Sequence, residues 1–299
     1  MSAAVSKDVE PRGRIRMAKG FTWPNDARIC VVITVLVENW SDRKAPSYSP
    51  MTTPLKAGTY DLAGVNWQQY GGRSGAWRIL KILDKYKLPA TFACNARSLE
   101  LYPQLAPAIV KAGHEVAAHG YTQDAALVYM TPEEQRDIIR RSIKILKDKT
   151  GTRPVGWLSP VLATTDETEV LIAEEKFLWY GDYNNIDLPH RARNKGGRFV
   201  AIPHSDYADN RTLRLMPRAW YDMHVDTFDY LYRNEPTSFL NVTVHANYGG
   251  RPLVSAMIDK FLNYMQGFPG VWVPRHDELA RFVNKRGIDE WTYQQRFFK

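Results

Sequence analysis

Short apolar runs alternate with segments of helical periodicity along most of the chain. The longest run, ARICVVITVLV (27–37), is almost entirely aliphatic, which is typical of a strand covered on both faces. Further strands are predicted wherever a short apolar run is bounded by turn residues. They lie at 89–95, 114–120, 155–159, 177–183, 198–204, 239–248 and 270–274.

Helical segments separate these strands. Their apolar residues recur at intervals of three and four, at 74–86, 97–113, 131–150, 166–176, 223–234, 254–267 and 276–287. The clearest start is at Thr131, a threonine cap that is followed by a proline and then by Glu134 at the third helical position. Residues 41–72, by contrast, are rich in Pro, Gly and Ser, so we expect a long loop or lid there.

Alternation of strands and helices at this spacing predicts parallel β/α units. About seven such units and the absence of a dinucleotide-type glycine loop favour a (β/α) barrel over an open doubly wound sheet. We expect one barrel domain at residues 21–286. A flexible polar arm (1–20) would precede it, and a short tail (287–299) would follow.

Composition and charge narrow the function classes. The chain has 299 residues, 44% of them hydrophobic, and a net charge of +8. Its basic residues are dispersed, which indicates a solvated surface and not a nucleic-acid footprint. Cys30 and Cys94 lie inside predicted strands, as buried free thiols would. With no apolar run of membrane-spanning length and no signal-like N-terminus, we expect a cytoplasmic protein that binds neither membranes nor nucleic acid.

Polar side chains follow several of the predicted strands at the point where each ends. Glu38 follows the first strand, His119 ends HEVAAHG, and His245 ends the apolar part of FLNVTVHANY. Other strand ends carry Asn95, Ser159 and Asp182. Because active groups of parallel β/α folds gather at the carboxyl ends of strands, we expect these side chains to share a pocket.

Each candidate has a structural alternative. A lone buried histidine such as His119 more often satisfies a hydrogen bond than binds a metal, and His245 taken alone is equally open. Glu38 is harder to explain structurally, because a carboxylate after a long aliphatic run is costly to bury. Ser159 lacks the G-x-S-x-G elbow that would activate it. His204 could line the pocket or simply lie in a loop.

Several motifs, in order, resemble the polysaccharide deacetylase (NodB-homology) superfamily. They are Glu38, YGGRSGAWR (70–78), HGYTQ (119–123), RPVGWLSP (153–160) and TVHANYGGRP (243–252). The resemblance covers about residues 20–285 and is strongest to the allantoinase-like branch, whose members hydrolyse amide bonds of small molecules. It implies a distorted (β/α)7-type barrel in a single domain.

The departures from the deacetylase pattern affect its metal site. That pattern has two Asp residues at the first strand end, a base and a metal ligand, and two His ligands four residues apart. Leu36 stands at the base position, Glu38 at the carboxylate ligand, His119 at the first His and Gln123 at the second. The sequence therefore leaves two possibilities open. A divalent metal such as zinc could be held by Glu38, His119 and Gln123, or by Asp124 in place of Gln123. The site could equally hold no metal. Gln123 and Asp124 could equally begin a turn.

The resemblance also suggests roles. Glu38 would be the general base, with a pKa raised by its dry strand end. His119 would orient the water or the carbonyl, and His245 would protonate the leaving nitrogen. Tyr70 and Arg73, in a glycine-rich loop, would clamp the substrate, with Trp40 and Trp157 as walls. The role of Arg153, which in the family braces the missing Asp, is open.

These residues favour a hydrolase of non-peptide C–N bonds acting on a small, cyclic amide, ureide or imide. One alternative is a metal-dependent N-deacetylase of an acetamido sugar or another N-acyl compound. A second alternative is an inactive barrel that binds a ligand, which the loss of the usual base at Leu36 would explain. The expected partners are a small-molecule substrate and other copies of the chain, in a dimer or tetramer.

Overall fold

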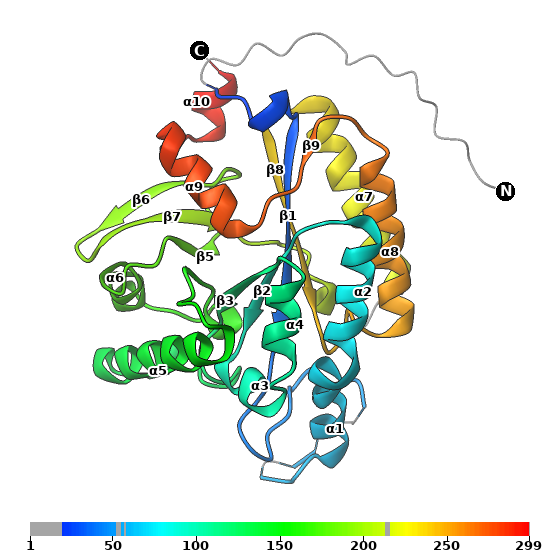
Figure 1. The fold of residues 1–299 in the computed structure, drawn as a ribbon, viewed down its shortest axis with the longest axis vertical. Coiled ribbons are helices and arrows are strands. Elements are labelled where there is room, and N and C mark those ends of the chain that lie inside the picture. Colours follow the sequence, from blue (N-terminus) through cyan, green and yellow to red (C-terminus); the bar gives the residue numbers. More distant parts are fainter. Residues whose placement is uncertain (1–19, 52–54, 57, 213–215, 299) are drawn as a thin grey trace, which may run out of the picture.

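The computed structural model describes residues 20–51, 55–56, 58–212 and 216–298. Within these ranges one sheet runs in the order β6-β7-β5-β4-β3-β2-β1-β8, and β9 pairs with β1 (Figure 1). Every pairing is parallel except that of β6 with β7. The strands are β1 (Ile29–Val37), β2 (Thr91–Cys94), β3 (Glu115–Ala118), β4 (Gly156–Trp157), β5 (Trp179–Tyr183), β6 (His190–Asn194), β7 (Gly197–Pro203), β8 (Ser238–His245) and β9 (Val271–Trp272).

Helices α2, α4, α7 and α8 lie along the outer face of the curled sheet (Figure 1). The predicted single-domain distorted (β/α) barrel is confirmed, as a sheet that curls through part of a barrel without closing. The helices are α1 (Leu62–Tyr70), α2 (Ala76–Tyr86), α3 (Ala96–Leu101), α4 (Leu105–Lys111), α5 (Pro132–Thr150), α6 (Asp166–Glu174), α7 (Pro217–Asn234), α8 (Pro252–Gln266), α9 (His276–Arg286) and α10 (Tyr293–Phe297).

Strand β1 separates two apolar cores, because successive side chains of a strand point to opposite faces. Its odd-numbered residues, such as Val35, pack with the outer helices, whereas Cys30, Val32 and Leu36 belong to the core inside the barrel. Glu38 follows Leu36 by two residues and so lies on the inner side, above that apolar plug. The alternation therefore aims the carboxylate into the barrel mouth.

Helix α5 begins as predicted. Thr131 caps it in a capping box with Glu134, and Gly151 ends it at a φ of 78°. The predicted loop at 41–72 is wrong in its last third, where α1 forms and continues through a π-helical turn at Gly71–Gly75 into α2. Strand β6 was not predicted, because its HRARN sequence shows no apolar run.

The structure describes the C-terminal end of the chain more fully than the N-terminal end. The predicted flexible arm lies outside the described residues, apart from residue 20. In the predicted tail, α10 packs against the body: the guanidinium of Arg296 is buried and donates to the carbonyl of Thr237 at 3.3 Å. No helix in the described part of the chain is long and apolar enough to cross a membrane.

Candidate active site

Glu38, His119 and His245 come from three separate segments and meet at the barrel mouth. Glu38 Oε1 lies 3.5 Å from His119 Nε2 and 3.6 Å from His245 Nε2. All three side chains are almost completely buried. One carboxylate oxygen thus faces two imidazoles, an arrangement that suits proton transfer.

The orientation of His119 is fixed by the neighbouring strand. Its Nδ1 lies 2.8 Å from the carbonyl oxygen of Leu158, and a carbonyl can only accept, so Nδ1 carries a proton and donates it. In the neutral ring Nε2 then presents a lone pair. That atom has no hydrogen-bond partner in the described structure, and neither has Glu38 Oε1. The two atoms therefore frame a place for a water or a substrate group.

Asp209 holds His245 from the other side, and sequence reasoning missed this residue. Its Oδ1 accepts from His245 Nδ1 at 2.6 Å, and its two oxygens accept from the backbone N–H of His245 at 3.0 and 2.9 Å. Burial opposes the charged imidazole, but Glu38 and Asp209 outweigh it and raise the pKa of His245 to about 9. His245 is therefore an imidazolium at neutral pH, with Nε2–H directed towards Glu38.

The expected raised pKa of Glu38 is wrong. Burial does raise it, but the positive charge of His245, together with His119 and the Tyr48 hydroxyl, brings the pKa below its ordinary value. Tyr48, also missed from the sequence, donates to Glu38 Oε2 at 3.3 Å. Glu38 is thus a carboxylate over the physiological range. The prediction considered only the burial of the strand end and did not include the contacts of Glu38 with His245, His119 and Tyr48.

The residues that follow His119 do not fit a complete zinc site. The described residues contain no group of three His, Cys, Asp or Glu side chains placed to hold one ion. Gln123 has an unpartnered amide oxygen, which is a poor zinc ligand. Asp124 accepts from the backbone and hydroxyl of Ser41 and pairs with Lys44 at 3.2 Å, so it anchors the loop after β1.

Three of the predicted substrate-binding residues lie in unexpected surroundings. Trp157 is fully buried in the outer core against Phe177 and donates to Ser159, so it does not form a wall of the mouth. Tyr70 and Arg73 belong to a helix and its π-helical turn and not to a flexible loop. The Tyr70 ring packs under Arg251, whose Cζ lies 4.2 Å from the ring centroid, while Arg73 is exposed.

Other strand-end residues support the mouth. Trp40 is buried beside Tyr48, with ring centroids 6.0 Å apart, in the position of a wall. Asn95 accepts from the backbone N–H of Asn39 and donates to the carbonyl of His119, which ties the ends of β1 and β3 together. Asp182 accepts from the backbone N–H of Ser159 at 2.9 Å. Ser159 is fully buried, and this contact gives it a structural role.

Arg153 braces a turn far from any catalytic carboxylate. Its guanidinium donates to the backbone carbonyl of Glu175 and lies 5.1 Å from the Phe177 ring centroid. The role of Arg153, which the sequence left open, is therefore structural: its contacts hold the end of α6 in place.

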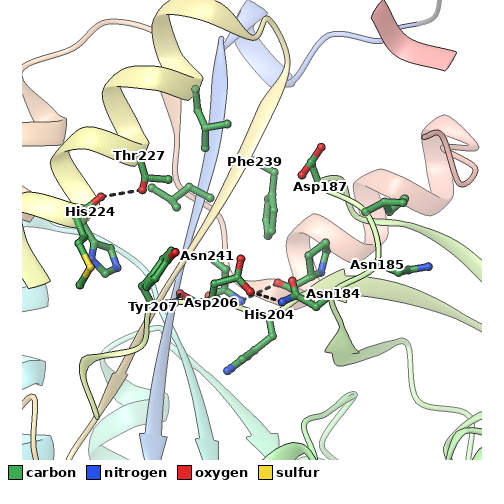
Figure 2. A pocket seen from close by; sticks show the side chains of 16 residues that line it. Asn184, Asn185, Asp187, His204, Asp206, Tyr207, His224, Thr227, Phe239 and Asn241 are labelled. Atoms are coloured by element: carbon green, nitrogen blue, oxygen red, sulfur yellow. Dashed lines mark hydrogen bonds between the residues drawn. The ribbon is translucent and has the colours of Figure 1, made fainter. Parts of the chain in front are cut away.

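A cavity of about 280 Å³ opens where the sheet fails to close, and neither Glu38, His119 nor His245 lines it. It lies between the β5–β6 connection, the segment after β7, helix α7 and strand β8, and Figure 2 shows the polar side chains along it. His204 lines it. Burial and the neighbouring His245 and His119 lower the pKa of His204 to about 3, so this imidazole stays neutral. The ring thus lies between the cavity and the catalytic histidines.

Comparisons with known proteins give one consistent family. The family model described as polysaccharide deacetylase matches residues 59–176. A peptidoglycan deacetylase of Helicobacter pylori is 28% identical over 253 residues, which cover 73% of this chain and 86% of that protein.

Two solved structures are similar over most of the chain. A probable polysaccharide deacetylase from Pseudomonas aeruginosa PAO1 has a TM-score of 0.81 at 29% identity, covering 88% of this chain and 93% of that one. PuuE allantoinase has a TM-score of 0.81 at 28% identity, covering 93% and 98%.

Proposed function

Because the chain belongs to the polysaccharide deacetylase superfamily, whose members hydrolyse non-peptide carbon–nitrogen bonds, we propose that it opens the amide bond of a small cyclic amide, ureide or imide. The supporting observation is the pairing of an ionised base with a charged acid. Glu38 is a carboxylate, His245 is an imidazolium held by Asp209, and their nearest atoms are 3.6 Å apart.

The two groups divide the reaction between them. Glu38 takes a proton from a water molecule as the water oxygen bonds to the substrate carbonyl carbon. The carbonyl π electrons move to oxygen and form a tetrahedral intermediate. When that intermediate collapses, the C–N bond breaks and its electron pair takes the Nε2 proton of His245. The products are a carboxylic acid and the released nitrogen group, which is an amine from a lactam, an amide from an imide and a urea from a ureide. The two are joined in one chain if the substrate was a ring, and the Glu38 proton returns through solvent to His245.

His119 contributes position in this scheme. Its Nδ1–H is committed to Leu158, so Nε2 is the ring atom that faces Glu38, and a water lying between Nε2 and Glu38 Oε1 is held by both. Trp40 and Tyr48 cover the cluster on the side of the loop after β1. Water exclusion of this kind strengthens the electrostatic interactions inside the site.

Deacetylation of an acetamido compound is the second candidate, and the peptidoglycan deacetylase of H. pylori supports it. Deacetylases of this superfamily typically use a divalent metal, and here Glu38 and His119 would be two of its ligands. Metal analysis of the purified protein separates the candidates. Zinc at one ion per chain, with loss of activity on chelation, would favour deacetylation over the metal-independent scheme.

Glu38→Gln tests the role of the base. The amide cannot accept a proton from water, so kcat on a panel of cyclic ureides, imides and lactams should fall by about 10²- to 10⁴-fold. Glu133→Gln, the same change at an exposed position in α5, should leave kcat unchanged. Undiminished turnover by Glu38→Gln contradicts the assignment. A wild-type protein that binds such rings and never turns them over supports the inactive barrel.

A further inference from the structure

The side chain of Asn247 is an unusual feature of the site. It is 1% exposed, and neither Nδ2 nor Oδ1 makes a well-formed hydrogen bond to the described protein, although the Tyr48 hydroxyl lies close enough to interact with one of them. In the described part of the chain it is the one side chain with two such buried atoms. An amide buried without partners costs free energy of unfolding, so an amide kept in this state indicates that a ligand supplies the partners.

Asn247 is also held in place. It lies two residues beyond His245, and its backbone carbonyl accepts from Arg251 Nε at 3.2 Å. Gly71 packs so closely on it that a Cβ there would come within 3.1 Å of the Asn247 nitrogen. The backbone of Asn247 therefore has little freedom to turn its side chain towards other partners.

Tyr48 connects the amide of Asn247 with Glu38. The Tyr48 hydroxyl, which donates to Glu38 Oε2 at 3.3 Å, lies beside the Asn247 side chain. A single hydroxyl can serve one end of an amide but not both. The unpaired amide is therefore next to the carboxylate that would activate water, on the side covered by the loop after β1.

A primary amide presents an N–H donor and a C=O acceptor side by side. The complementary partner carries an acceptor and a donor on one edge, which is the edge of a cis amide. Acyclic secondary amides, including acetamido groups, are trans by about 2.5 kcal/mol and place the two groups on opposite sides. Small lactam, imide and ureide rings are cis by construction.

We propose that Asn247 recognises the cis-amide edge of a substrate ring through a pair of hydrogen bonds. The site would then select cyclic over acyclic amides. This inference rests on the proposed function, since it names the substrate class of the same site. It makes Asn247 a residue that touches substrate and decides specificity.

Binding to an inactive background tests the inference apart from turnover. The probes are succinimide, N-methylsuccinimide and N-acetylglucosamine, titrated by calorimetry into Glu38→Gln and Glu38→Gln/Asn247→Leu. Leucine has the same branched arrangement of side-chain heavy atoms as asparagine and no polar atoms. We expect the second variant to bind succinimide about 10- to 100-fold more weakly, because two hydrogen bonds are lost.

N-methylsuccinimide has no N–H but keeps the carbonyl acceptor, so it should bind Glu38→Gln about 10-fold more weakly than succinimide and should lose less affinity than succinimide when Asn247 is replaced. The affinity for N-acetylglucosamine should be the same with and without the Asn247→Leu substitution. The melting temperature of Asn247→Leu should be unchanged or higher, because an unpaired buried amide is removed, whereas a purely structural asparagine would lower it.

Two outcomes are distinguishable. Equal succinimide affinity in the two proteins overturns this inference, even if the wild type hydrolyses rings. Loss of affinity in Asn247→Leu, with a wild type that never turns rings over, supports the inference and removes the proposed function.

Discussion

At the scale of single residues, the site holds the proposed base Glu38 and the proposed acid His245 with their nearest atoms 3.6 Å apart. Left alone, burial would neutralise both groups, since it disfavours every charge. Asp209 prevents this outcome. A second carboxylate on the far side of His245 stabilises the imidazolium, and the imidazolium in turn keeps Glu38 ionised. Asp209 thus acts on the base through the acid, without contacting substrate.

The pH dependence of kcat/KM should show the effect of Asp209 on His245 and of His245 on Glu38. The acidic limb should lie below the ordinary Glu pKa, where Glu38 takes up a proton, and the alkaline limb near pH 9, where His245 loses one. Asp209→Asn removes the stabilising charge, so His245 should deprotonate at lower pH. The alkaline limb should then move towards neutrality, and kcat/KM at pH 8 should fall by about 10-fold or more.

Asp222→Asn, at an exposed position on α7, is the matched control and should leave the profile unchanged. A merely structural Asp209 would lower kcat/KM equally at all pH values. An alkaline limb that stays near pH 9 in Asp209→Asn would therefore contradict the electrostatic role.

At the scale of elements, two strand connections are packed backbone to backbone. The π-helical turn at Gly71–Gly75 lies against the end of β8, where His245 and Asn247 are placed. A Cβ on Gly75 would come within 1.7 Å of the carbonyl oxygen of Ala246, between these two residues. The glycines of this turn therefore set the position of the proposed acid and of the proposed specificity residue.

Gly75→Ala should displace the end of β8 by the width of a methyl group. We expect kcat to fall by about 10²-fold and the free energy of unfolding by about 1–3 kcal/mol, because a misplacement of about 1 Å disturbs the reacting geometry. Gly113→Ala controls for stability: with φ at 81° and nothing within 4 Å, it should cost about 1–2 kcal/mol and leave kcat unchanged. Steady-state kinetics and urea unfolding measure both effects. Equal kcat in the two variants would contradict the positioning role.

The same scale shows what the sequence could and could not predict. Period-two alternation along β1 places Glu38 on the inner face, and the parallel β/α pattern places His119 and His245 at the same edge. Trp157 was misplaced because β4 has two residues and is buried on both sides, so no alternation marks its inner face. Asp209 and Tyr48 lie in irregular connections. Their contacts with His245 and Glu38 leave no periodic signal in the sequence.

At the scale of the whole molecule, the open seam of the sheet raises the question of what holds the barrel together. Asn241 of β8 spans it. Its Nδ2 donates to the carbonyl of Pro203, at the end of β7, at 3.1 Å, and its Oδ1 accepts from Thr34 of β1 at 2.8 Å. The cavity in Figure 2 lies beside this bridge and is lined by Asn241 itself. The predicted homo-oligomer and cytoplasmic location stay predictions, the first of them open to light scattering.

Asn241→Leu keeps the branched shape of the side chain and removes this bridge across the seam. The Pro203 carbonyl and the Thr34 hydroxyl would each lose a buried partner, at about 1–3 kcal/mol for each group, so we expect the free energy of unfolding to fall by about 2–4 kcal/mol. Urea unfolding measures the change, with exposed Asn66→Leu on α1 as control. If Asn241→Leu is as stable as the control, the pairing of β1 with β8 is enough to hold β8 in place. The hydrogen bonds of Asn241 would then contribute to the shape of the cavity and not to stability.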